Sequence, residues 1–165
     1  MRGGLLVASL LGLCVLAAVA LRSLDSKPEV GKLLVARPRA TDPTFDRTVV
    51  LLVREEARGM LGVILNRTSP PDGYSALREG DRFGGPVSRH RLVVWEERGT
   101  LRWRSLQEEE APPPGAVSFT GLSGWATGQL EAEIRRGSWW VTSLDAAHVL
   151  GDPEELWWKA SAAAD

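Results

Sequence analysis

The sequence predicts an α+β domain, in which a few helices pack on a largely antiparallel sheet, preceded by an N-terminal apolar helix. Three observations favour this class. Short apolar and β-branched runs recur along the chain with turn residues between them, as is typical of antiparallel strands. Only two or three stretches have the period or the capping residues of a helix. The first residues form one uncharged apolar run.

Composition places residues 31–165 in one domain. The chain has 165 residues, of which 44% are hydrophobic and 25% charged, as in ordinary globular domains. Cys14 is the single cysteine, which excludes an internal disulfide framework and a zinc site made of several thiolates. Residues 1–30 form a separate unit, a signal-anchor or transmembrane segment followed by a linker.

The N-terminal run covers residues 3–21, which carry no charge and lie between Arg2 and Arg22. Its length is near the lower limit for crossing a bilayer, so we expect a single N-terminal membrane anchor. Two alternatives stay open: secretion after signal cleavage near Ala18-Val19-Ala20, and a natural start further along the chain. The flanking charges favour opposite orientations, so the side of the membrane also stays open.

Six short runs in the rest of the chain are predicted to be strands. They cover residues 32–36, 48–53, 60–65, 92–96, 100–104 and 116–119. The second run is apolar throughout, which predicts a strand covered on both faces. Turn residues at 55–59 and at Gly99 predict two hairpins. Residues 66–82, rich in Pro, Gly and Asp, are predicted to be a loop, and residues 83–87 a constrained turn.

The rest of the chain is organised around Gly121–Trp140. The three early glycines of this stretch predict a loop. Residues 129–136 follow as a short amphipathic helix, because two apolar residues lie four apart among charged ones, and Gly137 ends it. Residues 139–141 are aromatic and β-branched, which predicts a strand. This unit cannot bury its apolar face alone, so the preceding strands must supply the other wall.

Two helical segments are predicted at the end of the chain. Residues 145–149 form a single turn that Gly151 closes. Asp152 and Pro153 mark the start of a longer helix, because aspartate caps a helix and proline suits its first position. We expect this helix to run through residues 156–159 and to fray in the Ala/Ser tail.

Several separated motifs together resemble the YqgE/AlgH family. They are Leu34-Val35-Ala36, Asp42-Pro43-Thr44-Phe45, Thr48-Val49-Val50, residues 62–67, Phe83-Gly84-Gly85-Pro86-Val87, Gly121–Trp140 and residues 153–158. The ordered set covers residues 31–160. The resemblance implies an α+β domain with a largely antiparallel sheet. It implies no reaction, since the family is mostly uncharacterised and carries a historical label as a transcriptional regulator.

The chain departs from the family pattern in the length of two connections. Family members usually carry longer, partly helical segments before the Gly-Gly-Pro-Val turn and before the glycine loop, and they lack an apolar leader. Both connections are short here. The chain therefore resembles a trimmed, membrane-directed version, in which we expect no partner site built on the missing helices.

No residues combine into a pattern for catalysis or for metal binding. His148 follows Asp145 by about one helical turn, which fits an exposed histidine at a helix end. His90 lies in a basic turn. Ser123 is followed directly by glycine, which is the wrong spacing for a nucleophile elbow. We therefore expect no catalytic residue, no cofactor and no metal.

A partner-binding or structural motif is predicted instead at Gly84, Gly85, Pro86, Gly121, Gly124, Trp125, Gly128 and Gln129. Close packing of the glycine loop on the sheet explains the glycines better than an anion site at the helix N-terminus, because the lysine of a phosphate loop is missing. Trp125, Trp139 and Trp157 are predicted in the core. The other four tryptophans include an exposed minority that contacts a partner or the membrane surface.

The charge of the chain argues against nucleic acid as the partner. Residues 28–165 contain 17 basic and 20 acidic residues, a net charge of −3, whereas DNA binding requires a basic face. The one basic cluster is interpreted as a solvated surface; it comprises Arg82, Arg89, Arg91, Arg102 and Arg104. We predict a non-enzymatic binding or regulatory module, tethered to the membrane, with a protein partner. The alternatives are a DNA-binding transcriptional regulator and an unrecognised hydrolase.

Overall fold

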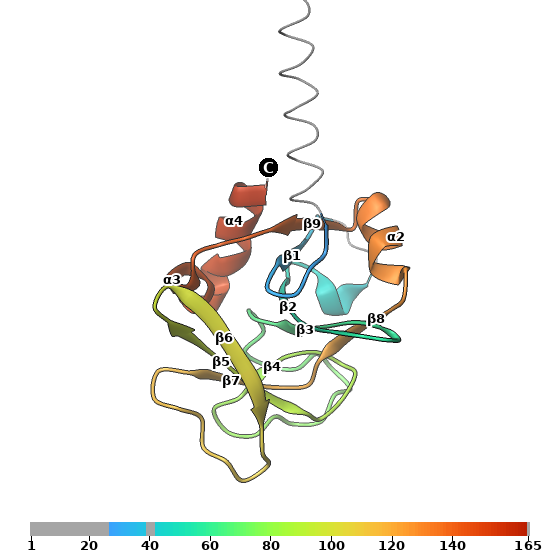
Figure 1. Cartoon of the computed structure of the whole chain (residues 1–165). Helices are drawn as coiled ribbons and strands as arrows, with labels where there is room; N and C mark the ends of the chain where they lie inside the picture. Colours follow the sequence, from blue (N-terminus) through green and yellow to red (C-terminus); the bar gives the residue numbers. More distant parts are fainter. Residues whose placement is uncertain (1–26, 39–41, 165) are drawn as a thin grey trace, which may run out of the picture.

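Two sheets form the framework of the computed structural model, which describes residues 27–38 and 42–164 (Figure 1). One sheet has the strand order β8-β3-β2-β1-β9 and the other β4-β7-β5-β6. Every neighbouring pair is antiparallel except β4 with β7. The predicted α+β class with a largely antiparallel sheet is confirmed for the described residues. The strands are β1 (Leu33–Ala36), β2 (Val49–Glu56), β3 (Gly59–Ile64), β4 (Arg82–Phe83), β5 (Arg91–Glu97), β6 (Thr100–Leu106), β7 (Val117–Thr120), β8 (Ser123–Ala126) and β9 (Trp139–Thr142).

The five-stranded sheet is buried on both faces, as predicted for its apolar strands. On β1, Leu33 and Val35 belong to one core cluster, whereas Leu34 and Ala36 belong to the other. This division follows from the period of two in a strand, because successive side chains point to opposite faces. The β2–β3 pairing that continues the sheet is irregular between Leu52 and Arg54.

Different elements cover the two faces of this sheet. The first cluster joins the sheet to the four-stranded sheet and to α4 (Pro153–Ala164) through residues such as Phe119 and Leu156. The second cluster lies under α2 (Gln129–Arg135), whose Leu130 is 2% exposed. In Figure 1, α2 therefore lies apart from the side where α4 and the four-stranded sheet pack. Trp125, Trp139 and Trp157 are 5%, 5% and 6% exposed, which confirms the prediction that they are core residues.

Two strands were missed because their sequences carry little strand signal. Residues 123–126 form β8, which pairs with β3, so the predicted glycine loop is wrong over these four residues. Glycine lowers strand propensity, and it is the neighbouring strand that makes β8 extended. Residues 82–83 form β4, which pairs in parallel with β7. Two residues are too few to show the alternation of apolar and polar side chains that indicates a strand.

The helices begin and end close to the predicted residues. Gly137, with φ +80°, follows the C-cap of α2, as expected for a left-handed residue after a helix. α3 (Ala146–Val149) is capped by Asp145, and Asp152 accepts the Glu154 N–H at the start of α4. The predicted frayed tail is wrong, since α4 continues through residue 164. A 3-10 turn, η1 (Pro43–Phe45), follows β1.

The predicted membrane segment, residues 3–21, lies outside the described residues. Over residues 27–38 and 42–164, no helix combines the length and the apolar composition needed to cross a bilayer.

Candidate functional site

The two glycine motifs that the sequence singled out meet at the junction of the two sheets. The Gly84 N–H donates to the Thr120 carbonyl at 2.8 Å, and the Gly84 carbonyl accepts from Ile64 N–H at 2.8 Å. Three residues on, Val87 N–H donates to the Leu122 carbonyl at 2.8 Å. The turn at residues 84–87 is thus held by backbone bonds where the chain passes from β7 to β8.

Only glycine fits at the closest points of this junction. A Cβ at Gly121 would lie 2.1 Å from the Gly85 carbonyl oxygen, and a Cβ at Gly85 would lie 2.4 Å from the backbone of Leu122. Both residues also have positive φ, +90° and +145°, which side chains disfavour. A Cβ at Gly84 would lie 2.3 Å from the Gly121 carbonyl oxygen. The three glycines therefore allow the backbone of residues 84–85 to lie directly against that of residues 121–122.

The other two glycines of the stretch have different roles. A Cβ at Gly124 would make ordinary contacts with Leu61 and Val87. At Gly128 a Cβ would meet nothing within 4 Å, but φ is +78° and the residue is the N-cap of α2. Close packing therefore accounts for Gly121, whereas the left-handed backbone accounts for Gly128.

Trp125 and Gln129 belong to a hydrogen-bonded group centred on Glu133. The indole N–H of Trp125 and that of Trp139 both donate to Oε2 of Glu133, at 2.9 and 2.8 Å, and the Gln129 amide donates to its Oε1 at 2.9 Å. Gln129 also accepts the Ala126 N–H at 3.0 Å. In the sequence, Glu133 is one of the charged residues of the predicted helix 129–136, and no partner is evident for it. The spacing Gln129–Glu133, one helical turn, was the available signal.

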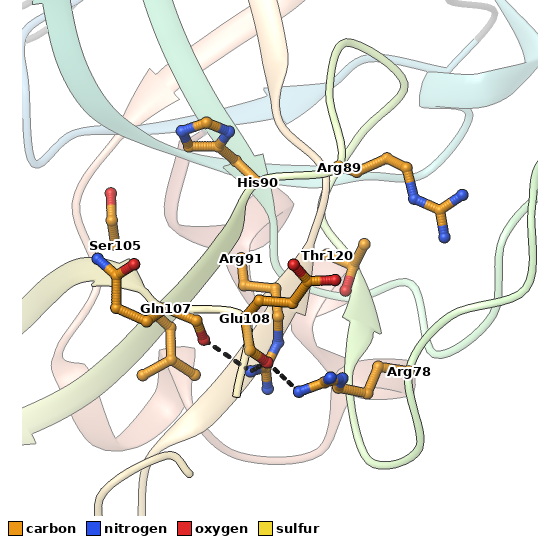
Figure 2. A pocket seen from close by; sticks show the side chains of 9 residues that line it. Arg78, Arg89, His90, Arg91, Ser105, Gln107, Glu108 and Thr120 are labelled. Atoms are coloured by element: carbon orange, nitrogen blue, oxygen red, sulfur yellow. Dashed lines mark hydrogen bonds between the residues drawn. The ribbon is translucent and has the colours of Figure 1, made fainter. Parts of the chain in front are cut away.

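A basic hollow of about 420 Å³ lies beside the junction, where β5 begins (Figure 2). Arg78, Arg89, His90 and Arg91 line it together with the Glu108 side chain. Figure 2 shows Arg78 and Arg91 converging on the backbone of residues 107–108. Arg78 donates to the Glu108 carbonyl and to a carboxylate oxygen of Glu109. The hollow therefore carries more positive than negative side chains.

Arg91 is fixed below this hollow by a buried carboxylate, Asp81. Its Nε and Nη2 donate to the two Asp81 oxygens at 2.9 and 3.0 Å, and Ser118 and Thr120 each add a hydroxyl at 2.6 Å. Burial alone would raise the pKa of Asp81, but the hydrogen bonds from Arg91, Ser118 and Thr120 and the Arg91 charge outweigh burial and lower it. Asp81 is therefore ionised at neutral pH, and its charge neutralises Arg91.

An apolar hollow of about 310 Å³ adjoins the basic one, and Arg89 and Thr120 line both. Its other lining residues include Phe83, Gly85, Pro86, Tyr74, Leu77 and Val87. Tyr74 is 41% and Val87 53% exposed, and both are among the few large hydrophobic residues exposed in the described chain. The tyrosine ring lies on Phe83 with ring centroids 5.3 Å apart. We call the set Tyr74, Leu77, Pro86, Val87 and Arg89 the Tyr74–Arg89 surface.

The structure does not bring the candidate residues for catalysis together. Ser123 is fully buried, and its hydroxyl donates to the Gly84 carbonyl at 3.5 Å. His148 pairs with Asp145 at 3.1 Å, and both are exposed on α3. His90 lies apart from them in the basic hollow. Over the described residues, no group of three or more His, Cys, Asp or Glu lies close enough to hold a metal ion.

The five arginines of the basic cluster do not form one free face. Arg91 pairs with Asp81, Arg102 with Glu97 and Arg104 with Glu110, and Arg82 donates to the Leu65 carbonyl at 3.2 Å. Within the described chain, Arg89 is the one arginine of this cluster whose side chain makes no hydrogen bond or ion pair. The charge available to a ligand is correspondingly smaller than the sequence indicates.

The fold and the glycine junction define an α+β domain built of two joined sheets, and the sequence identifies its family. A sequence model of the AlgH-like family matches residues 33–111 and 103–164. A UPF0301 protein of Streptomyces coelicolor is 38% identical over 158 residues, which cover 77% of this chain and 82% of the relative. A UPF0301 protein of Mycolicibacterium smegmatis is 36% identical, with 77% and 78% covered. The chain belongs to the AlgH-like family, as its motifs predict.

Solved structures have the same fold. The solution structure of the AlgH protein of Pseudomonas aeruginosa matches with a TM-score of 0.61 at 26% identity, over 84% of this chain and 90% of that one. A crystal structure of a Corynebacterium diphtheriae protein matches with a TM-score of 0.62 at 22% identity, over 81% and 86%. The family is uncharacterised, so membership assigns no reaction.

Proposed function

We propose that this chain is a non-enzymatic binding module, tethered to the membrane by residues 3–21, whose partner is a protein. The Tyr74–Arg89 surface is the contact site in this proposal. It takes an extended segment of the partner, with an apolar side chain against Tyr74 and Val87 and an acidic one at Arg89.

The observation that carries the proposal is the combination of exposed apolar groups with an unpaired charge. Val87 and Tyr74 are 53% and 41% exposed, and both line one hollow with Arg89. An arginine without an internal partner gains most from an incoming carboxylate, because Arg–carboxylate bonds are charge-assisted and commonly two-fold. The adjoining basic hollow adds Arg78 and His90. Arg78 already pairs with Glu109, so Arg89 is the positive charge that an acidic side chain would meet.

The backbone behind this surface supports the proposal as well. Gly84, Gly85 and Gly121 hold the turn that carries Pro86 and Val87 through direct backbone bonds. A surface on a fixed turn loses little conformational freedom when a partner binds, which favours affinity. Tyr74 and Leu77 come from the short connection before this turn, so the surface combines that connection with residues 86–89.

The two other hypotheses have less support. A DNA-binding regulator needs several free cations on one face, yet four of the five clustered arginines are engaged within the protein. A hydrolase needs an accessible nucleophile within reach of a base, yet Ser123 is buried and bonds to a backbone carbonyl. Salt-sensitive retention of DNA that Arg89→Glu abolishes would revive the first hypothesis.

Site-specific photo-crosslinking in cells tests the binding proposal. Tyr74 is replaced by p-benzoyl-phenylalanine, and Glu131, exposed on α2, receives the same replacement as the control position. We expect one discrete heavier species from position 74, absent from position 131, and weakened by Arg89→Glu. The matched control Arg98→Glu changes an exposed turn residue and should leave it intact. This contact site would be refuted if position 74 gave no adduct, or if Arg89→Glu left the yield of the adduct unchanged.

A further inference from the structure

A third hollow, of about 430 Å³, lies beside α2. Three aromatic residues, Phe45, Trp125 and Trp139, line it together with two carboxylates, Asp42 and Glu133. These residues come from η1, β8, α2, β9 and the segment before η1. β8 and β9 are opposite edges of the five-stranded sheet, so the fold assembles this hollow from distant parts of the chain.

The three rings pack against one another. Trp139 is nearly perpendicular to Trp125, with interplanar angle 82° and centroids 5.8 Å apart, and to Phe45, with 77° and 5.5 Å. Phe45 and Trp125 are tilted by 38° with centroids 6.1 Å apart. Aromatic faces carry a negative quadrupole, and several faces around one space are the arrangement that holds organic cations.

Glu133 supplies a half-buried negative charge to this hollow. Its oxygens accept from two indole N–H groups and one side-chain amide, all of them neutral. No cation among the described residues pairs with it. A carboxylate that is partly removed from water and has only neutral donors retains a strong attraction for a cation.

The remaining charges of the lining are one carboxylate and one guanidinium. Asp42 caps η1 through the Thr44 N–H, which donates to Oδ1 at 2.8 Å, and its other oxygen bonds to no residue that the structure describes. Arg136 also lines the hollow, and its guanidinium makes no hydrogen bond or ion pair with a described residue. The lining therefore has two negative groups, one positive group and three aromatic rings.

We propose that this hollow is a binding site for an organic ammonium ion, with Glu133 as the counter-charge and Phe45, Trp125 and Trp139 as the aromatic walls. The simpler alternative gives Glu133 a structural role only, as the acceptor for two indole N–H groups. The binding role and the structural role differ in the ligand preference that they predict. A structural role predicts no preference for a cation over a neutral molecule of the same shape.

Nuclear magnetic resonance of the full chain measures that preference. The sample is the nitrogen-labelled protein in a sugar-headgroup detergent, which carries no ammonium group. Tetramethylammonium is titrated against tert-butanol, its neutral counterpart, and the indole N–H signals of Trp125 and Trp139 are followed. We expect these two signals to shift saturably with the cation and not with the alcohol. Assignment uses Trp125→Phe and Trp139→Phe.

Charge variants of α2 then test the role of Glu133. Glu133→Gln keeps an acceptor for the indole groups but removes the charge, and we expect the affinity to fall about tenfold or more, since a charged partner is lost. Glu131→Gln, exposed on the same helix, is the matched control and should leave the affinity unchanged. If Glu133→Gln does not fold, Phe45→Leu serves instead, because it removes one aromatic wall and keeps an apolar side chain.

Arg136 gives a test with the opposite sign. Arg136→Gln removes the positive group of the lining and should tighten tetramethylammonium binding a few-fold, whereas Arg135→Gln, exposed beside it, should not. Titrations with choline and with Nε-trimethyl-lysine, which carry the same cation, distinguish a free small molecule from a modified protein side chain. The proposal is overturned if the wild-type signals do not saturate, if tert-butanol shifts them equally, or if Glu133→Gln binds as Glu131→Gln does.

Discussion

Arg91 and Asp81 form a two-bond ion pair, with Nε 2.9 Å from Oδ2 and Nη2 3.0 Å from Oδ1. Their side chains are 9% and 1% exposed. The pair attaches the loop before β4 to the start of β5. The remaining nitrogen of Arg91, Nη1, makes no hydrogen bond to Asp81. It donates to the carbonyls of residues 107, 108 and 110, at 3.3, 3.2 and 3.0 Å. Two irregular segments therefore depend on one guanidinium.

Replacing the carboxylate should destabilise the fold strongly. Asp81→Asn leaves Arg91 buried without a counter-charge, and breaking one partner of a buried pair costs about 3–5 kcal/mol. Urea unfolding at neutral pH measures the loss. Asp72→Asn, in the exposed part of the same loop, is the control and should change the free energy of unfolding by less than about 0.5 kcal/mol. Equal stability of the two variants would contradict the importance of the pair.

The same pair gives a defined pH dependence. The folded protein lowers the pKa of Asp81 below the ordinary 3.8, so the ionised form is the one that folding favours. Its contribution is complete above the pKa of the unfolded state and is lost as the pH falls through the lower pKa of the folded state. The stability difference between wild type and Asp81→Asn should therefore be constant near neutral pH and shrink in acid. A difference that grows on acidification would show the opposite shift.

Alanine at Gly121 should cost more than the backbone strain alone. Gly121 and Gly73 have almost the same φ, +90° and +88°, but a Cβ at Gly73 would meet nothing within 4 Å. Gly73→Ala therefore measures the left-handed strain, about 1–2 kcal/mol. Gly121→Ala adds the clash with the Gly85 carbonyl oxygen at 2.1 Å, and such overpacking costs a further 1–3 kcal/mol or so. Thermal unfolding of both variants compares them directly.

The pattern of apolar residues was sufficient to predict most of the fold. Each of the seven predicted strands is present, because apolar runs between turn residues define a strand without reference to the rest of the chain. A local pattern does not show which strands pair, so it could not predict that β1 pairs with β9, more than 100 residues away in sequence. β8 was missed for the same reason, since Gly124 weakens the local signal and the hydrogen bonds to β3 create the strand.

The candidate sites were harder to predict because their residues come together only in the fold. Trp125 and Gln129 belong to the predicted motif, but Glu133, which accepts hydrogen bonds from both, is in the sequence only one of several charged residues of the helix. Asp81 lies in a polar loop, and nothing nearby in sequence shows that Ser118 and Thr120 will face it. In both cases the charged side chain bonds to residues on other elements. A local sequence pattern contains no information about those partners.

Trp157 and Trp158 are adjacent but should respond differently to substitution. Trp157 is buried, and its indole N–H donates to the Ala36 carbonyl at 2.8 Å, whereas Trp158 is 61% exposed. Trp157→Phe removes that donor and leaves a buried acceptor with one bond fewer, which costs about 1–3 kcal/mol. Trp158→Phe should stay within about 0.5 kcal/mol of wild type. Urea unfolding of the pair checks both values, and similar losses would show that α4 is not anchored by this bond.

The full chain should fractionate with membranes, and a chain that begins at residue 28 should not. Residues 3–21 would span about 28 Å as a helix, close to the ~30 Å of a bilayer core. Their uncharged sequence favours retention over cleavage, because no polar cleavage region separates the run from Arg22. Sedimentation after an alkaline wash, followed by immunoblotting, distinguishes an inserted helix from surface attachment.

Protease protection in intact and opened cells then assigns the domain to one side of the membrane. Arg2 and the terminal amine favour an inside N-terminus, whereas Arg22, Lys27, Lys32, Arg37 and Arg39 favour an inside domain, so the sequence leaves the side open. A domain that is protected until the cells are opened lies inside, and a domain that is digested in intact cells lies outside. Full-length chain in the supernatant would refute the anchor, and a mature N-terminus at Leu21 would show that the run is a cleaved signal.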